Sequence, residues 1–426
     1  MGRVSIFWFR RDLRLKDNTA LNQALSSEKN ILPIFIFDEQ IIGELPKDDA
    51  RITFIYDNLL KIHQKLQSIN SSLLCLKGNP FEVWKELLQT YAVKSVFVNK
   101  DYEPYAISRD AKIENLLAEK GIEFLSFKDQ VILEENEVLK KDGKPYTVFT
   151  PYKRRWLELF NPKKPVDTLK EQNFHQKKIP FPDLQALGFK KSNIQVRAYN
   201  LSHIANYAET RDFPNLDTTS YLGPLLRFGT VSIRYVISML KHVDHVFLSE
   251  LIWREFFMQI LYHFPQVVTR NFKPRYNGIR WINNKDDFKR WCEGHTGYPM
   301  VDAGMRQLNE TGYMHNRIRM ITAGFLCKHL LIDWRWGEAY FAKKLLDYEL
   351  SSNNGNWQWA AGTGCDAAPY FRVFNPMDQL KKYDRNKTYV IKWIPELGTD
   401  AYPAPMIEHK YARQRALETY KRGIVK

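Results

Sequence analysis

The chain has 426 residues and a formal net charge of +15, with 44% hydrophobic and 26% charged residues. This balance excludes a disordered or fibrous chain, and the length calls for about two or three domains. No apolar run approaches the roughly 18 residues of a membrane span, and the N-terminus is typical of a strand and loop, not of a secretory signal. Four scattered cysteines without a CxxC pair fit a reducing compartment, so we expect a cytoplasmic protein.

Residues 1–130 alternate short apolar runs with amphipathic helical patterns. Near-continuous apolar strands separated by helices predict a parallel, Rossmann-like five-stranded sheet covered on both faces. The expected strands are Val4–Phe9, Ile31–Phe37, Leu73–Leu76, Ser95–Val98 and Ile122–Phe127, and the expected helices are Arg51–Ser68, Phe81–Thr90 and Ala106–Lys120.

The loop after the first predicted strand, FRRDLRLKDN, contains no glycine. A dinucleotide-binding Rossmann turn needs glycines where the backbone meets the pyrophosphate. The residues therefore argue against a dinucleotide at the usual place in this domain.

Residues 131–197 are rich in Lys, Pro, Gln and Asn, which is typical of a long linker. From residue 198 to residue 426 the patterns are mostly helical, which predicts an all-α C-terminal domain. The expected helices are Phe247–His263, Asp286–Glu293, Pro299–Glu310, Asn316–Leu331 and Trp336–Leu346.

Charge is distributed unevenly between these parts. Residues 1–130 contain 18 basic and 18 acidic residues, whereas residues 131–426 contain 45 basic and 30 acidic residues and hold the whole +15. A neutral half joined to a basic half suggests that the second half binds a polyanion such as nucleic acid, although a solvated basic surface is the alternative.

The segment SELIWREFF places Glu250, Trp253 and Arg254 at helical positions i, i+3 and i+4, on one face. An acid, a flat aromatic ring and a guanidinium together could bind a planar polar ligand. The alternative is a surface ion pair beside a packed tryptophan.

In GYMHNRIRM, Arg317 and Arg319 lie about 200° apart on a helix, so they cannot serve the same partner. Asn316 and Met320 share a face. One arginine could contact phosphate while the other contacts a buried group, or both could be solvated.

The segment from Asp347 to Pro376 combines polar residues, tryptophans and glycines. Polar residues beside Gly355 suggest a close approach of the backbone to a ligand, or else an irregular loop. In the earlier segment TTSYLGPLLRFG, Thr219 or Ser220 is a plausible N-cap whose helix start could bind phosphate, although most caps bind only their own helix. No metal-ligand motif and no nucleophile motif is present.

Taken in order, ELIWREF, TGYPMVDAGMRQL, GYMHNRIRM, NNGNWQWAAGTG and DAAPYFRVFNP resemble the photolyase/cryptochrome family over nearly the whole chain. The chain is most similar to bacterial class I cyclobutane pyrimidine dimer photolyases. The resemblance implies an α/β antenna domain at 1–130, a linker at 131–197 and a helical FAD- and DNA-binding domain at 198–426. It also implies a carbon–carbon lyase in which photoexcited reduced FAD passes an electron to a flipped-out dimer in DNA.

The resemblance also assigns residues to FAD. Asn353 would face flavin N5, where an amide does not titrate near neutral pH as an acid can. Gly223 stands where the family often has Ser, and Glu349 stands where it usually has Asp. The residues expected to bind FAD are Tyr207, Thr219, Ser220, Leu222, Gly223, Arg319, Asp347, Glu349 and Asn353.

A second group would contact the lesion and the DNA. Trp253 would stack on the flipped dimer, and Glu250 would bond its base edges and act as a catalytic group. The residues expected to bind DNA or the lesion are Arg211, Glu250, Trp253, Arg254, Asn316, Arg317, Met320, Arg372 and Gln379.

Trp281, Trp334 and Trp357 match the tryptophan chain that carries electrons to FAD in this family, although three core tryptophans are the plain alternative. Glu103 lies where members bind a second, antenna chromophore of the folate or deazaflavin type. We expect ultraviolet-damaged DNA as the partner of a monomer that needs neither a membrane nor an obligate protein partner.

Two other functions compete with repair. A cryptochrome-like blue-light signalling flavoprotein would share the fold, but Asn353 and the absence of a long C-terminal extension favour repair. A non-catalytic nucleic-acid-binding module would carry no flavin, so the purified protein would be colourless.

Overall fold

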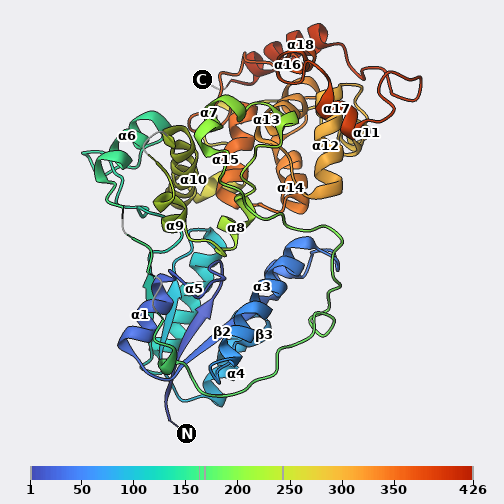
Figure 1. The fold of residues 1–426 in the computed structure, drawn as a ribbon. Helices are drawn as coiled ribbons and strands as arrows, with labels where there is room; N and C mark the ends of the chain where they lie inside the picture. The colour runs from blue at the N-terminus through green and yellow to red at the C-terminus, as the bar shows by residue number, and fades with distance from the viewer. Residues whose placement is uncertain (1, 163, 167–168, 242–243, 425–426) are drawn as a thin grey trace. The chain divides into compact units, whose positions relative to one another are not determined.

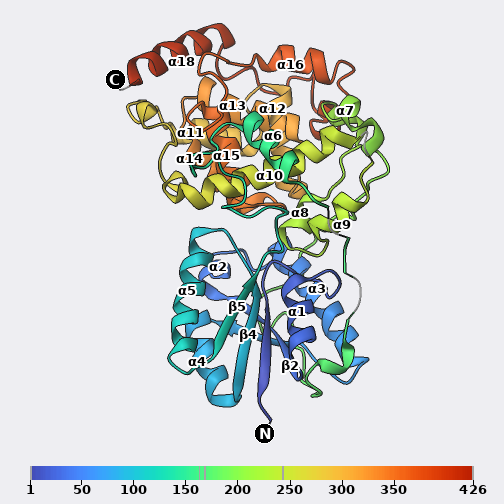
Figure 2. The same cartoon turned by 90° about the vertical axis from the view of Figure 1, so that its left-hand side faces the viewer.

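The computed structural model describes residues 2–162, 164–166, 169–241 and 244–424 (Figure 1, Figure 2). It forms two compact units that are built from separate stretches of the chain. Unit 1 comprises Met1–Val138, Trp156–Ala198 and Leu222–His242, and unit 2 comprises Leu139–Arg155, Tyr199–Tyr221 and Val243–Lys426. The domain ranges 1–130, 131–197 and 198–426 stay a prediction.

Unit 1 contains the predicted parallel sheet, with the strand order β3-β2-β1-β4-β5. All four strand pairs are parallel, and every residue of β1 and β2 is buried, as near-continuous apolar runs require. The strands are β1 (Val4–Phe9), β2 (Ile31–Asp38), β3 (Leu74–Gly78), β4 (Val93–Asn99) and β5 (Glu123–Phe127).

Helices cover both faces of this sheet (Figure 2). One core joins Phe7 and Phe9 to α1 and α3, and a second core joins Trp8 to α4 and α5, because successive strand residues point to opposite faces. The helices of unit 1 are α1 (Thr19–Ser27), α2 (Glu39–Ile42), α3 (Ala50–Gln67), α4 (Pro80–Thr90), α5 (Pro104–Ala118), α8 (Gly223–Arg227) and α9 (Ile233–Ser238).

Unit 2 is helical, which confirms the predicted fold class. The predicted helix Asn316–Leu331 is in fact α13 followed by a π-helical turn at Phe325–His329. The helices lying wholly in unit 2 are α7 (Tyr207–Thr210), α10 (His245–His263), α11 (Lys285–Glu293), α12 (Pro299–Thr311), α13 (Asn316–Gly324), α14 (Trp334–Lys344), α15 (Leu350–Ala361), α16 (Pro376–Tyr383), α17 (Thr388–Trp393) and α18 (His409–Gly423). No helix among the described residues is long and apolar enough to span a membrane.

The predicted linker contains a helix that the composition of the segment obscured, α6 (Phe149–Leu159). Phe149, Tyr152 and Trp156 recur at helical spacing and are 7%, 1% and 1% exposed. The surrounding lysines, arginines and prolines made the segment look like a surface linker. The aromatic spacing was the signal that could have revealed the helix.

Helix α15 packs closely against two neighbours because glycines stand at the contacts. A Cβ atom on Gly355 would lie 2.2 Å from the ring of Phe257 on α10, and one on Gly337 of α14 would lie 2.1 Å from the ring of Trp357 on α15. At Gly355 the close approach is that of an aromatic ring from the next helix. The expectation of a ligand near this polar segment stays a prediction.

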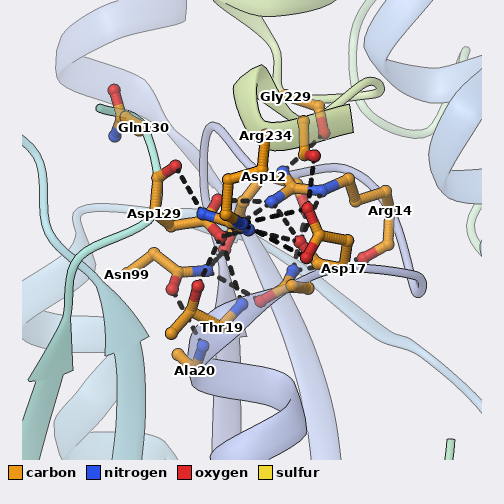
Figure 3. Close-up of polar contacts among 12 residues, drawn as sticks. Asp12, Arg14, Asp17, Thr19, Ala20, Asn99, Asp129, Gln130, Gly229 and Arg234 are labelled. Atoms are coloured by element: carbon orange, nitrogen blue, oxygen red, sulfur yellow. Dashed lines mark hydrogen bonds and ion pairs between the residues drawn. The ribbon is translucent and has the colours of Figure 1, made fainter. Parts of the chain in front are cut away.

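A buried charge cluster forms at the carboxyl ends of the strands in unit 1 (Figure 3). The guanidinium of Arg14 donates to both oxygens of Asp129 at 2.7 and 2.6 Å, and Arg234 of α9 donates to Asp129 at 2.7 Å and to Asp17 at 3.0 Å. Arg14 also donates to the carbonyl of Gly229 at 2.9 Å. The cluster therefore fixes the segment that carries α8 and α9 to the loop after β1.

Burial alone would raise the pKa of Asp129, but the two guanidinium groups lower it well below its usual range. The carboxyl thus contributes stability that is present above its unfolded pKa and lost as the pH falls towards its folded pKa. We expect Asp129→Asn to remove the carboxylate partner of buried Arg14 and one of the two partners of Arg234, and to lower the free energy of unfolding by about 3–5 kcal/mol.

Guanidinium denaturation at pH 7 measures this loss. Glu82→Gln is the control, because Glu82 forms an exposed pair with Lys85 at 3.0 Å in the same unit and should cost at most about 0.5 kcal/mol. Equal, small losses in the two variants would show that the cluster does not stabilise the unit.

Candidate functional site

Asn353 lies on α15 with its amide group oriented by α14. Its Nδ2 atom donates to Glu338 Oε1 at 2.8 Å and to the Glu338 carbonyl at 3.2 Å. Burial raises the pKa of Glu338, although the bond from Asn353 opposes that rise. Among the described residues none donates to Asn353 Oδ1, so this oxygen is available to accept a hydrogen bond from a ligand.

An oriented acceptor of this kind fits a reduced flavin, because N5 of the reduced ring carries a hydrogen to donate. The residues at this position therefore suit the cofactor that the sequence predicts. Sequence reasoning missed Glu338, which lies fifteen residues before its partner.

An ion pair joins α10 to the start of α15. Arg254 Nη2 lies 3.1 Å from Glu349 Oε1, and the two side chains are 12% and 6% exposed. The residue assigned to the lesion and the residue assigned to FAD thus contact each other. Glu349 also accepts from Ser352 Oγ at 3.3 Å.

The two arginines of α13 serve different partners, as their angular separation requires. Arg319 pairs with Asp347 at 2.9 Å and donates to the carbonyl of Met314 at 2.8 Å, so the two predicted FAD residues Arg319 and Asp347 come together. Arg317 pairs with Asp212 at 2.7 Å. Asp212 was not predicted, and no local pattern singled it out.

Glu250 and Arg211, both assigned to DNA or the lesion, form an ion pair at 2.6 Å. The Arg211 guanidinium also lies 5.2 Å from the centre of the Tyr207 ring. Burial raises the pKa of Tyr207 to about 12, and the charge of Glu250 adds to the rise. Tyr207 is therefore a neutral hydrogen-bonding group at the pH of the cell.

Trp253 is half-buried on α10, and its indole lies flat against the ring of Phe149. Phe149 was not among the predicted site residues. Because α6 was not predicted, no local pattern indicated that residue 149 lies near residue 253.

The segment assigned to the FAD phosphates has no regular structure before α8. Thr219 and Ser220 belong to unit 2, whereas buried Leu222 and exposed Gly223 belong to unit 1. The predicted N-cap at Thr219 or Ser220 was wrong, because α8 begins at Gly223 with Leu222 as its N-cap and no side-chain cap bond. The backbone carbonyl of Ser220 accepts from Asn200 at 2.9 Å.

The three tryptophans assigned to electron transfer lie in or against one core. Trp334 and Trp357 are 0% and 2% exposed, and Trp281 packs partly exposed at the edge. Trp334 Nε1 donates to Asn271 at 2.9 Å, and the Trp281 ring meets the Tyr420 ring edge-on at 5.9 Å. The assigned tryptophan chain therefore has a buried end at Trp357 and a solvent-accessible end at Trp281.

The remaining residues assigned to DNA or the lesion vary in exposure. Asn316 and Arg372 are exposed, and Met320 and Gln379 are partly buried. In unit 1, Glu103 pairs with Arg11 at 2.8 Å and with Arg227 at 3.6 Å, so its carboxylate already has two cationic partners.

The chain is similar to known proteins in sequence and in fold. Residues 5–170 match the model described as DNA photolyase, and residues 247–400 match the FAD binding domain of DNA photolyase. A deoxyribodipyrimidine photo-lyase from Vibrio cholerae is 37% identical over 98% of this chain and 99% of its own length.

Solved structures give the same result. A bacterial class III photolyase from Agrobacterium tumefaciens has a TM-score of 0.90 at 32% identity, covering 99% of this chain and 98% of its own. An archaeal photolyase from Sulfolobus tokodaii, solved with two FAD molecules, has a TM-score of 0.86 at 33% identity, covering 98% of this chain and all of its own.

His315 caps the helix that presents Asn316, Arg317 and Arg319. Its Nδ1 atom accepts from the Arg317 backbone N–H at 3.2 Å, which requires an unprotonated Nδ1. Burial lowers the pKa of His315 to about 4. Between pH 4 and the ordinary value of 6.5 the unfolded chain therefore binds this proton and the folded chain does not.

The stability that neutral His315 contributes is therefore present above pH 6.5 and lost as the pH falls towards 4. Asn at position 315 keeps a capping oxygen but does not titrate. We therefore expect His315→Asn to reduce the slope of unfolding free energy against pH in this range by the contribution of about one proton. Urea midpoints measured from pH 4 to pH 7 test this, and an unchanged slope would contradict it.

Proposed function

The chain belongs to the DNA photolyase family, and we propose that it uses light to split cyclobutane pyrimidine dimers in ultraviolet-damaged DNA. Members of this family are enzymes that act on damaged DNA, and their helical domain binds FAD. Bound FAD, when reduced and illuminated, supplies the electron that opens the cyclobutane ring.

The observation that carries the proposal is the Arg254–Glu349 ion pair at 3.1 Å. It joins the helix assigned to the lesion to the helix assigned to the cofactor. Electron transfer needs the donor and the acceptor close together, and two helices in direct contact can hold them so. The buried pair also fixes both side chains, since neither charge can lose its partner without a large desolvation cost.

On the cofactor side, Asn353 supports an enzyme that holds a reduced flavin. The amide is held by Glu338, accepts through Oδ1 and cannot donate a titratable proton to a flavin nitrogen. Arg319 of α13 and Asp347, which lies just before α15, place a positive and a negative group 2.9 Å apart. Tyr207, Thr219, Ser220, Leu222 and Gly223 remain assigned to the phosphates and ribose by the family motif alone.

On the lesion side, Trp253 offers a flat apolar surface and Glu250 offers acceptors for base-edge N–H groups. Arg211, at 2.6 Å from Glu250, offsets the carboxylate charge that would otherwise oppose negative charge developing on the lesion. Asn316 and Met320 complete the assigned pocket. An unpaired, unstacked dimer costs less to extrude than a normal base, which favours damaged sites without base-sequence readout.

Binding of the surrounding DNA would depend on phosphate contacts. The net charge of +15 resides in residues 131–426, and we assign Arg317, Arg372 and Gln379 to the backbone. Because Arg317 already has a carboxylate partner, a phosphate has to compete with Asp212 for it. Because phosphate contacts release counterions from DNA, affinity should fall as the salt concentration rises.

The proposal predicts light-dependent loss of dimers. The reduced protein is mixed with an oligonucleotide carrying one thymine dimer, illuminated with blue light, and the remaining dimers are counted by chromatography. We expect the dimers to disappear in the light and to persist in the dark. A yellow, FAD-containing protein that leaves the dimers intact would instead support a signalling flavoprotein, and a colourless protein would support a simple nucleic-acid-binding module.

The tryptophan assignment predicts a separate result. Trp281→Phe should slow the light-driven reduction of bound oxidised FAD by an external thiol, because the solvent-accessible end of the chain is removed. It should spare repair once FAD has been reduced chemically. Trp393→Phe is the matched control, since Trp393 packs against the same core and is not in the assigned chain. An unchanged photoreduction rate in Trp281→Phe would refute this route.

A further inference from the structure

The indole of Trp253 carries a second aromatic ring on one face. The centre of the Phe149 ring lies 3.6 Å from that of the indole, and the two planes differ by 8°. Aromatic pairs in proteins usually prefer offset or edge-on arrangements with centres 4.5–7 Å apart, so a close parallel stack is an uncommon geometry. Something other than the pair itself must hold the rings this way.

Two contacts besides the stack hold Phe149 in place at the start of α6. Its backbone N–H donates to Asp366 Oδ2 at 3.0 Å, and its ring meets Phe256 of α10 edge-on at 5.8 Å. One turn later, Tyr152 packs on the same Phe256 ring at 5.2 Å. The first turn of α6 is therefore fixed to α10 on the side of Trp253.

Exposure shows which of the two rings a ligand can reach. Phe149 is 7% exposed, whereas Trp253 is half-buried and keeps accessible surface. The neighbouring Phe257 ring also stacks near the indole, with ring centres 5.4 Å apart and planes that differ by 28°. Because the Phe149 ring occupies one face of the indole at 3.6 Å, a base that stacks on Trp253 must use accessible indole surface away from Phe149.

We propose that Phe149 is a positioning residue of the lesion pocket, because its ring fixes the plane of the Trp253 indole against which a flipped base stacks. This inference rests on the proposed function. A tryptophan side chain that is already ordered loses less conformational entropy when the base arrives, so the gain should appear in binding of damaged DNA. Undamaged DNA, which does not insert a base, should not benefit.

The test compares three variants of the full-length, FAD-containing protein. Phe149→Leu removes the flat ring, Phe149→Tyr keeps it, and Tyr152→Leu removes a neighbouring ring that packs on Phe256 without stacking on Trp253. Fluorescence anisotropy measures the affinity of each for one labelled oligonucleotide with and without a single thymine dimer. FAD absorbance checks that each variant is folded.

We expect Phe149→Leu to weaken binding of the dimer-containing oligonucleotide by about 2- to 10-fold and to leave binding of the undamaged one unchanged. Phe149→Tyr should restore the discrimination, and Tyr152→Leu should retain it. Equal weakening on both oligonucleotides, or the same loss in Tyr152→Leu, would show that Phe149 acts only on stability and would overturn the inference.

Trp253→Ala separates this inference from the proposed function. If Trp253→Ala abolishes discrimination while Phe149→Leu does not change it, the lesion pocket stands and the role of Phe149 fails. If the unmodified protein neither discriminates nor repairs, the proposed function itself fails.

Discussion

Close packing of α15 between α10 and α14 is the constraint on which the site depends. Gly355 lets the Phe257 ring approach α15, and Gly337 lets the Trp357 ring approach α14; in both places a Cβ would lie about 2 Å from a ring atom. With a side chain at Gly355 or Gly337, α10 and α14 could not pack so closely against α15. The short polar links of the site, Arg254–Glu349 and Asn353–Glu338, follow from this proximity.

Three arginines of the candidate site are paired with carboxylates. Arg211 has Glu250, Arg317 has Asp212 and Arg319 has Asp347, each at less than 3 Å. Pairing holds long side chains in fixed positions and lowers the cost of keeping them partly buried. In the proposed complex a phosphate or a base would have to replace one of these carboxylate partners, so recognition would depend on geometry as well as on net charge.

Unit 1 uses buried charge for a different purpose. Asp129 sits between Arg14 and Arg234, and the latter belongs to α9, more than two hundred residues after the first strand (Figure 3). The glycine-free loop that argued against a dinucleotide at this place supplies Arg14 to the cluster. These charged residues thus tie a distant segment, α8 and α9, to the sheet of the same unit.

The sequence alone determined the parallel sheet, the helical second half and most helix positions, because periodic apolar patterns are local and each strand or helix buries its own stripe. It also singled out the motif residues of α10, α13 and α15. The tertiary structure decided what the local pattern cannot contain: that α6 lies within the predicted linker, that Gly355 faces Phe257, and that Phe149 stacks on Trp253. These contacts join residues about a hundred positions apart, and their partners are fixed only when the helices pack together.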